Sequence, residues 1–319
     1  MFTPALRFIK NQYPECNITF LTNAPNKPVL DKISYIDKVI TIQRKKAFSR
    51  IRPVKELVNQ DYVIFTDWQP QLSLLAFLLG IPVRAGIPKP GHFFSRFLNK
   101  VLVNNVMHST NYAAKTNALI FSEALGVQIV GDMTKPDISR PSETDVRIAV
   151  DLLQRSGLSA DSVYICMAPF TGLEQRNWPL EYVQQFVSMV TTELRMPVLL
   201  IGPNDKRFEA ESIKGAHNLV GTTSIMQMVE IISRAKLYVG PDSGPMHIAG
   251  AVGTPLVALF SKDLPSRWMP QRNCRPITLE LPCSPCDDNT ARRCESLQCM
   301  HGITPEMVFA VTRQELDRL

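Results

Sequence analysis

The sequence predicts an α/β fold made of two doubly wound, Rossmann-like domains. Short apolar runs typical of strands alternate with segments whose apolar residues recur at the helical spacing. A polar stretch at residues 131–147, "GDMTKPDISRPSETDVR", interrupts this alternation and is typical of an interdomain linker. The 319 residues, of which 45% are hydrophobic and 20% charged, are enough for two ordinary globular domains. We therefore expect domains at residues 1–140 and 148–319.

The first half contains three strand-like runs, "NITFLT", "VITI" and "YVIFT". Each is followed by a segment with helical spacing, such as "QLSLLAFLLG". A basic, aromatic stretch, "GHFFSRFLNKVLVNN", and a helical segment, "NYAAKTNALIFSEALG", complete this half. The order predicts the strand and helix alternation of a parallel sheet.

The second half repeats the alternation more regularly. Strands are predicted at 162–169, 197–202, 218–221, 236–240 and 255–260, and helices at 179–194, 205–214, 224–235 and 246–252. Proline favours the first position of a helix because it gives up a donor that would be unpaired there, so Pro179 is expected to begin its helix. Thr304 as N-cap, followed by Pro305, predicts a terminal helix. The strand ends of two such domains are expected to face a central cleft that binds ligands.

The composition narrows the class of protein. Thirty-five Lys and Arg residues against 29 Asp and Glu residues give a net charge of +6, which favours anionic partners such as nucleotides, phosphates or acidic lipids. The longest apolar runs, such as "LLAFLLGIPV", are about half as long as a membrane-spanning helix. The first residues lack the basic-then-apolar order of a signal peptide. We therefore expect a cytoplasmic protein.

The stretch "VGPDSGPMHIAGAVGTPLVALF", residues 239–260, contains the first candidate site. Its turn places the backbone amides of Ser243 and Gly244 near a helix N-terminus, which is an anion site. A phosphate there would repel Asp242, so that carboxylate is expected to accept hydrogen bonds from sugar hydroxyls instead. The alternative is structural: Asp242 or Ser243 caps the helix, and His247 is an ordinary buried histidine.

A second candidate site follows the first strand of the same half, in "MAPFTGLEQRNWP". A hydroxyl from Thr171, a free amide near Gly172 and the guanidinium of Arg176 can together neutralise a diphosphate. After the strand "PVLLIG", Asp205 can accept a hydrogen bond from a ribose hydroxyl. The alternatives are that Arg176 is a solvated surface charge and that Asp205 only begins a helix.

Five of the seven cysteines lie in a Cys-rich loop at residues 274–300. Cys283, Cys286, Cys294 and Cys299 form two close pairs that can surround one tetrahedral zinc or iron ion, with Cys274 as a spare ligand. Free thiols and disulfides are the alternatives. The loop is expected to lie far from the other motifs and to take no part in catalysis. Because acidic residues accompany its arginines, nucleic acid is not an expected partner.

Taken together, these motifs resemble glycosyltransferase family 9, the heptosyltransferases of the bacterial lipopolysaccharide inner core. Residues 239–260 are close to the family signature, "FTGLEQRNWPLEYVQQFV" is similar to its phosphate-binding turn and following helix, and "FTPALRFIKNQYPECNITFLT" is similar to its first helix and second strand. The resemblance implies a GT-B fold and inverting transfer without a catalytic metal. It also implies a donor, usually ADP-heptose, on the C-terminal domain and a lipopolysaccharide core or lipid A acceptor on the N-terminal domain.

The resemblance implies roles for the individual residues as well. Arg176, where relatives often carry lysine, would stabilise the charge on the departing ADP. Asp242 would bind sugar hydroxyls and Asp205 the nucleoside. The remaining donor-binding residues would contact the diphosphate or brace the loop that does so; they are Thr171, Gly172, Ser243, Gly244 and His247. A similar cysteine cluster holds a metal in some relatives.

One part of the family pattern does not occur in this sequence. In the family, the proton of the acceptor hydroxyl is taken by the aspartate of a Gly-Asp dipeptide at the end of the first strand, just before the "TPAL" helix. Here only "MF" precedes "TPAL", and Asp67 is a poor substitute. We therefore expect the N-terminal domain to lack its first strand. Either the true start lies upstream, or the chain is an impaired relative that only binds nucleotide-sugar or core glycan.

The basic, aromatic segment "KPGHFFSRFLNK" lies in the acceptor half. It contains Lys89, His92, Arg96 and Lys100. These cations are expected to grip the phosphates and acidic sugars of the acceptor, or to lie against the anionic face of the inner membrane. The alternative is a solvated loop and helix face.

Overall fold

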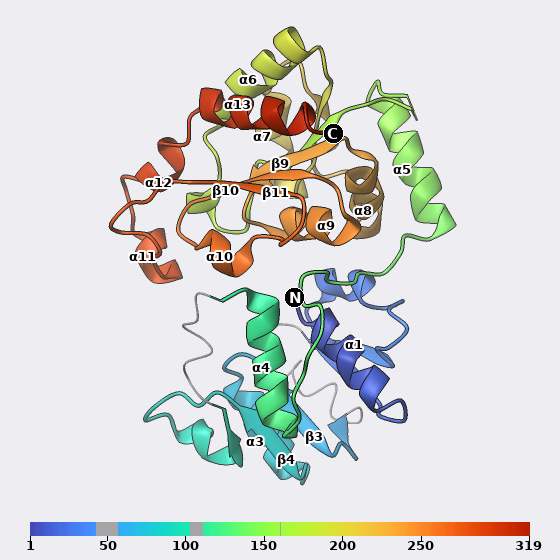
Figure 1. The fold of residues 1–319 in the computed structure, drawn as a ribbon, viewed down its shortest axis with the longest axis vertical. Helices are drawn as coiled ribbons and strands as arrows, with labels where there is room; N and C mark the ends of the chain where they lie inside the picture. The colour runs from blue at the N-terminus through green and yellow to red at the C-terminus, as the bar shows by residue number, and fades with distance from the viewer. Residues whose placement is uncertain (43–56, 103–110, 160) are drawn as a thin grey trace. The chain divides into compact units, whose positions relative to one another are not determined.

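The computed structural model of the chain describes residues 1–42, 57–102, 111–159 and 161–319 (Figure 1). Residue contacts divide the chain into two compact units, Met1–Ser139 and Arg140–Leu319. In the described part of each unit, every pair of hydrogen-bonded strands is parallel. The predicted α/β class with parallel sheets is therefore confirmed.

The first unit begins with a helix rather than a strand. Its α-helices are α1 (Thr3–Gln12), α3 (Pro70–Leu78) and α4 (Ala113–Leu125). Its strands are β1 (Thr19–Thr22), β2 (Lys38–Thr41), β3 (Tyr62–Phe65), β4 (Val83–Gly86) and β5 (Lys100–Val101). Short 3₁₀ helices lie at Ala24–Val29 and Phe93–Phe97.

Two of the helical segments expected in this unit are not seen as α-helices among the described residues. The segment after β1 forms the 3₁₀ helix Ala24–Val29 instead of an α-helix. Pro28 lies inside it, and proline removes a backbone donor that a longer α-helix would require. The segment expected after the strand "VITI" falls largely outside the described residues.

The described strands of the first unit form two sheets, β1-β2 and β3-β4-β5. Residues of the two sheets nevertheless pack together in two apolar clusters. Phe20 of β1 and Ile64 of β3 pack into one cluster with α1 and α4. Leu21 of β1 and Val63 of β3 pack into another cluster with α3. A cavity of about 320 Å³ is lined by residues of both β1 and β3.

The second unit is a larger α/β unit. Its strands are β6 (Ile165–Met167), β7 (Val198–Leu200), β8 (His217–Asn218), β9 (Leu237–Pro241), β10 (Leu256–Phe260) and β11 (Cys274–Thr278). Its helices are α5 (Glu143–Arg155), α6 (Leu180–Met189), α7 (Arg207–Glu211), α8 (Ile225–Arg234), α9 (Gly244–Val252), α10 (Pro265–Trp268), α11 (Asp288–Arg292), α12 (Gln298–His301) and α13 (Pro305–Leu316). One π-helical turn at Val190–Leu194 continues α6.

The six strands of this unit form one parallel sheet in the order β11-β10-β9-β6-β7-β8. Figure 1 shows α6 and α13 on one face of the sheet and α8 and α9 on the other. The chain runs outward from β6 through β7 to β8, and then returns to place β9 on the other side of β6. Open α/β sheets bind ligands at the carboxyl ends of the strands beside such a reversal. This edge, between β6 and β9, is where a site is expected.

Local hydrogen bonds fix several helix ends in this unit. The Ser142 and Ser224 side chains each form a capping box, and Thr304 accepts a hydrogen bond from the amide of Met307 at the start of α13. The prediction for Thr304 and Pro305 is confirmed. Pro179 is displaced by one residue from its predicted place, because it is the N-cap of α6 and the helix begins at Leu180.

Candidate functional site

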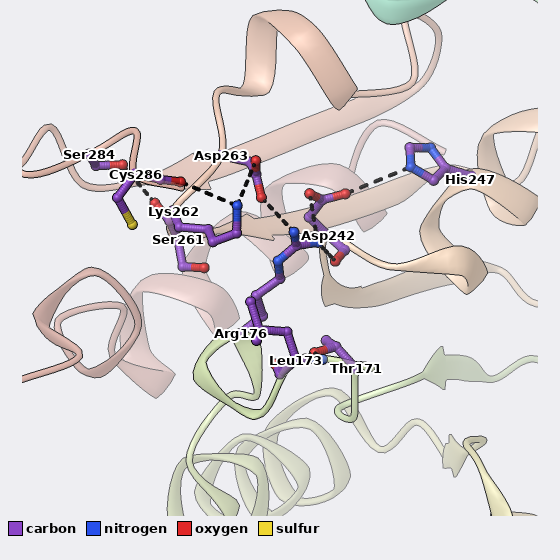
Figure 2. Close-up of polar contacts among 10 residues, drawn as sticks. All are labelled: Thr171, Leu173, Arg176, Asp242, His247, Ser261, Lys262, Asp263, Ser284 and Cys286. Carbon is purple, nitrogen blue, oxygen red and sulfur yellow. Dashed lines mark hydrogen bonds and ion pairs between the residues drawn. The ribbon is translucent and has the colours of Figure 1, made fainter. Parts of the chain in front are cut away.

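Three loops meet at the carboxyl edge of the six-stranded sheet (Figure 2). The loop after β6 contains Thr171 and Arg176, the turn after β9 contains Asp242, and the loop after β10 contains Asp263. Because β6, β9 and β10 are parallel neighbours, the loops that leave their carboxyl ends lie side by side. Two of the predicted motifs, which are far apart in the sequence, are thus brought together.

Arg176 lies at the centre of this group. Its Nη1 atom is 3.5 Å from the Asp242 carboxylate and 3.4 Å from the Asp242 carbonyl oxygen. Its Nη2 atom is 2.9 Å from Oδ2 of Asp263. The Arg176 side chain is 24% exposed. It is therefore a partly buried cation held between two carboxylates, and not the solvated surface charge of the alternative interpretation.

Asp242 is 6% exposed. Burial raises the pKa of its carboxyl to about 6, although the nearby Arg176 cation acts in the opposite direction. His247 lies next to it, with Nε2 3.7 Å from the carboxylate and its ring edge-on to Trp268. Burial lowers the pKa of His247 to about 4, so this imidazole is neutral at pH 7. Asp242 therefore faces a cation on one side and a neutral ring on the other.

The turn after β9 leads directly into α9. Ser243 is the N-cap residue of α9, but its hydroxyl accepts no hydrogen bond from the helix. Asp242 does not cap the helix either. A side chain at Gly244 would meet no atom within 4 Å, so its glycine is not demanded by packing. The helix N-terminus thus presents amides, a hydroxyl that does not cap the helix and open space, which is the arrangement that an anion requires.

In the loop after β6, Thr171 already forms hydrogen bonds within the loop itself. The Thr171 hydroxyl donates to the carbonyl of Leu173 and accepts from its amide, at 2.6 and 3.1 Å. The Thr171 amide donates to the side chain of Asn177. A ligand contact by Thr171 would therefore replace or share an existing bond. Gly172 is different, since a side chain there would meet nothing within 4 Å.

Asp205 lies in the 3₁₀ turn Asn204–Lys206 after β7. It is exposed, and it does not cap α7, whose N-cap is Lys206. Lys206 pairs with Glu209 of α7 at 2.7 Å and with Glu174 of the β6 loop at 3.5 Å. These pairs fix the β7 loop beside the β6 loop and leave the Asp205 carboxylate facing solvent.

The four cysteines predicted as metal ligands are all free, Cys283 exposed and the others half-buried. Burial raises the pKa of Cys299, and the thiols of Cys286, Cys294 and Cys283 raise it further. Within the described ranges, however, no group of three or more His, Cys, Asp or Glu side chains is arranged to hold a metal ion.

The Cys-rich loop is not remote from the other motifs, and that expectation was wrong. The Cys286 amide donates to the carbonyl of Lys262 at 3.0 Å, and the Ser284 hydroxyl donates to the carbonyl of Ser261 at 2.8 Å. Ser261 and Lys262 directly precede Asp263. Sequence reasoning also missed Lys262 and Asp263. The signal for them was a charged pair placed immediately after the buried run "PLVALF".

Comparison with known proteins identifies relatives for most of the chain. Residues 50–295 match the family model described as glycosyltransferase family 9 (heptosyltransferase). Lipopolysaccharide heptosyltransferase 3 of Escherichia coli K12 is 25% identical over 285 residues, covering 84% of this chain and 80% of the relative. Lipooligosaccharide heptosyltransferase 2 of Haemophilus influenzae is 26% identical, covering 82% and 79%.

Solved structures share the fold over nearly the whole chain. A glycosyl transferase family 9 protein from Veillonella parvula superposes with a TM-score of 0.82 at 20% identity, covering 99% of this chain and 93% of that one. E. coli ADP-heptose lps heptosyltransferase II gives 0.75 at 21% identity, covering 99% and 94%. The iron-containing glycosyltransferase TibC of enterotoxigenic E. coli gives 0.59 at 16% identity, covering 99% and 72%.

Proposed function

The chain belongs to glycosyltransferase family 9, and we propose that it transfers heptose from ADP-heptose to the lipopolysaccharide core. The observation that carries this proposal is the group at the carboxyl edge of the second unit. There the Arg176 guanidinium lies 3.5 Å from a buried Asp242 carboxylate, next to the unsatisfied N-terminus of α9. A cation and free amides suit a diphosphate, and a carboxylate suits the hydroxyls of the attached sugar.

The donor is held, in this proposal, by residues that the fold leaves available. The diphosphate lies at the N-terminus of α9, where the Ser243 hydroxyl and the Gly244 amide donate to it. Gly172 offers the same open approach from the β6 loop. The Asp242 carboxylate accepts from the sugar hydroxyls, and the exposed Asp205 carboxylate accepts from the ribose.

Transfer is an inverting displacement. An acceptor hydroxyl forms a bond to the anomeric carbon of heptose while the bond between that carbon and the ADP oxygen breaks. The hydroxyl proton passes to a general base, and the electron pair leaves with ADP. Arg176 stabilises the negative charge that grows on the departing diphosphate, which lowers the barrier because the charge is larger in the transition state than in the donor. His247, neutral at pH 7, braces Asp242 and is not the base.

We propose that the base is the aspartate of a further strand, upstream of α1, which would lie between β1 and β3 in the sheet. The pocket of about 320 Å³ at that place supports this proposal, because the described strands β1 and β3 both line it and are not hydrogen-bonded to each other. Asp67 follows β3, but it is exposed and accepts a hydrogen bond from Gln69 at 2.9 Å. The same pocket favours the second candidate function, in which the chain as it stands binds the nucleotide-sugar or core glycan without transferring.

A transfer assay with ADP-heptose and heptose-deficient core separates the two functions. We expect a version extended upstream by an apolar strand ending in Gly-Asp to transfer heptose, and the chain as it stands to be at least about 100-fold slower. Replacing the added aspartate by asparagine is the matched control and should return the slow rate. Equal rates for all three proteins would contradict the proposed position of the base.

The acceptor is proposed to meet the basic, aromatic segment at residues 89–100. Phe93 is 56% exposed, and the Arg96 guanidinium stacks on its ring at 3.7 Å. An exposed aromatic ring beside a cation suits a phosphorylated lipid headgroup or the inner membrane surface. Among the described residues, no helix is long and apolar enough to span a membrane.

A structural zinc or iron ion at Cys283, Cys286, Cys294 and Cys299 stays a prediction. The Cys-x2-Cys and Cys-x4-Cys spacings of these residues and the fold shared with an iron-containing relative support it. The thiols as placed do not form a coordinating group, so the described geometry does not fit a bound ion. No catalytic step depends on this metal. Zinc and iron content of the purified protein tests the prediction.

A further inference from the structure

The best ion pair of Arg176 is with a residue that has no role in the mechanism above. The Arg176 Nη2 atom is 2.9 Å from Oδ2 of Asp263, whereas its Nη1 atom is 3.5 Å from the Asp242 carboxylate. The Asp263 side chain is 18% exposed and comes from the loop after β10. Arg176 is thus drawn toward Asp263, and the Asp242 carboxylate is left with a looser contact.

Asp263 is itself held from the other side. Its Oδ1 atom lies 3.2 Å from Nζ of Lys262, whose side chain is 7% exposed. The same Nζ lies 3.3 Å from the carbonyl oxygen of Cys286. Figure 2 shows Lys262, Asp263, Arg176 and Asp242 as one continuous row of contacts. The two oxygens of Asp263 are therefore divided between two cations.

The row alternates in sign, with two cations and two carboxylates. Partly buried charges of this kind are stable only when each has an opposite partner, because desolvation is costly. Without the Asp263 carboxylate, Asp242 would be the one carboxylate of this row that remains beside Arg176. Arg176 would then form a tighter ion pair with Asp242 and occupy the carboxylate that the sugar hydroxyls require.

We propose that Asp263 is a positioning residue for the donor site: it holds Arg176 toward the diphosphate and so leaves Asp242 for the sugar. Lys262 fixes Asp263 in turn, and its contacts with Cys286 anchor this segment to the Cys-rich loop. The proposal rests on the donor site described above. In this proposal Asp263 does not contact the donor itself and acts only through Arg176.

The first test needs no ligand. In the ¹⁵N NMR spectrum of the free protein, the exchange of the Arg176 Nε proton with water reports how firmly the guanidinium is held. We expect Asp263→Asn to speed this exchange at least about tenfold, because one charge-assisted contact is lost. Glu315→Gln, which removes a 2.7 Å ion pair with Arg275 near the C-terminus, is the control and should leave the exchange unchanged. An unchanged rate in Asp263→Asn would overturn the proposal.

The second test is a double-mutant cycle on ADP-heptose binding. Asp263→Asn should weaken binding about tenfold, Asp263→Glu less, and Arg176→Ala about tenfold to 100-fold. Because Asp263 acts through Arg176, adding Asp263→Asn to Arg176→Ala should cause no further loss. Additive losses would contradict the positioning role. If the unaltered protein binds no ADP-heptose, the proposed function fails, and the proton-exchange test still decides the role of Asp263.

Discussion

At the scale of single residues, Asp242 has an environment unlike that of an ordinary, solvent-exposed carboxylate, because it is buried. Burial raises its pKa to about 6, so part of the population is protonated in mildly acidic buffer. A protonated carboxyl accepts hydrogen bonds from sugar hydroxyls more weakly than a carboxylate, because it has lost its charge and one oxygen carries a proton. The residue proposed to bind the sugar is therefore costly for the folded protein to keep ionised, which is common at functional sites.

Asp242→Asn should stabilise the free protein while it weakens donor binding. The pKa of Asp242 is higher in the folded than in the unfolded chain, so the folded state loses stability as pH rises from about 4 to about 6. Above pH 6 the variant should gain about 2–3 kcal/mol in the free energy of unfolding, and near pH 4 the gain should vanish. Urea denaturation from pH 4 to pH 8 measures this. A loss of stability at pH 8 would contradict the account.

How much of the site the sequence could predict also depends on the residue. Asp242 was predictable because it directly follows β9, and Arg176 because it lies in the loop after β6; parallel neighbours bring such loops to one edge. Asp263 was not, because its partner lies 87 positions earlier in the chain and only the strand order makes them neighbours. The internal bonds of Thr171 were also hidden, since nothing in "FTGL" says that the hydroxyl serves its own turn.

At the scale of elements, the local signals predicted many of the helices and strands but missed β4, β5 and β11, the last of which occupies the start of the predicted Cys-rich loop. Thr304 and Pro305 mark the start of α13 because capping is decided within one turn. The strand order could not be predicted from periodicity, which says that β6 and β9 are buried strands but not that they are neighbours. The segment Ala24–Val29 was expected to be an α-helix and is a 3₁₀ helix, because the prediction gave more weight to apolar spacing than to the prolines.

Loss of the cap on α13 should destabilise the second unit. The buried Trp178 indole donates a hydrogen bond to the carbonyl of Ile303 at 2.8 Å, just before the cap residue. This bond connects the N-terminus of α13 to the core. Thr304→Ala should lower the free energy of unfolding by about 1 kcal/mol. Thr192→Ala, at an exposed position, is the control and should change it by less than about 0.5 kcal/mol. Equal effects of both substitutions in urea denaturation would show that the cap is not needed.

At the scale of the whole chain, the two units differ in the continuity of their described sheets. The second unit has one continuous six-stranded sheet and a buried core around it. In the first unit the described strands form two sheets with a cavity between β1 and β3. All residues of the proposed donor site lie in the second unit. Binding of a donor can therefore be measured separately from transfer.

Isothermal titration calorimetry with ADP-heptose and with ADP tests the central claim most directly. The unaltered protein should bind both ligands. Asp242→Asn should weaken ADP-heptose at least about tenfold and ADP by less than about threefold, because only the sugar contact is lost. Arg176→Ala should weaken both ligands. Equal affinity of all three proteins for ADP-heptose would contradict the donor site proposed between β6 and β9.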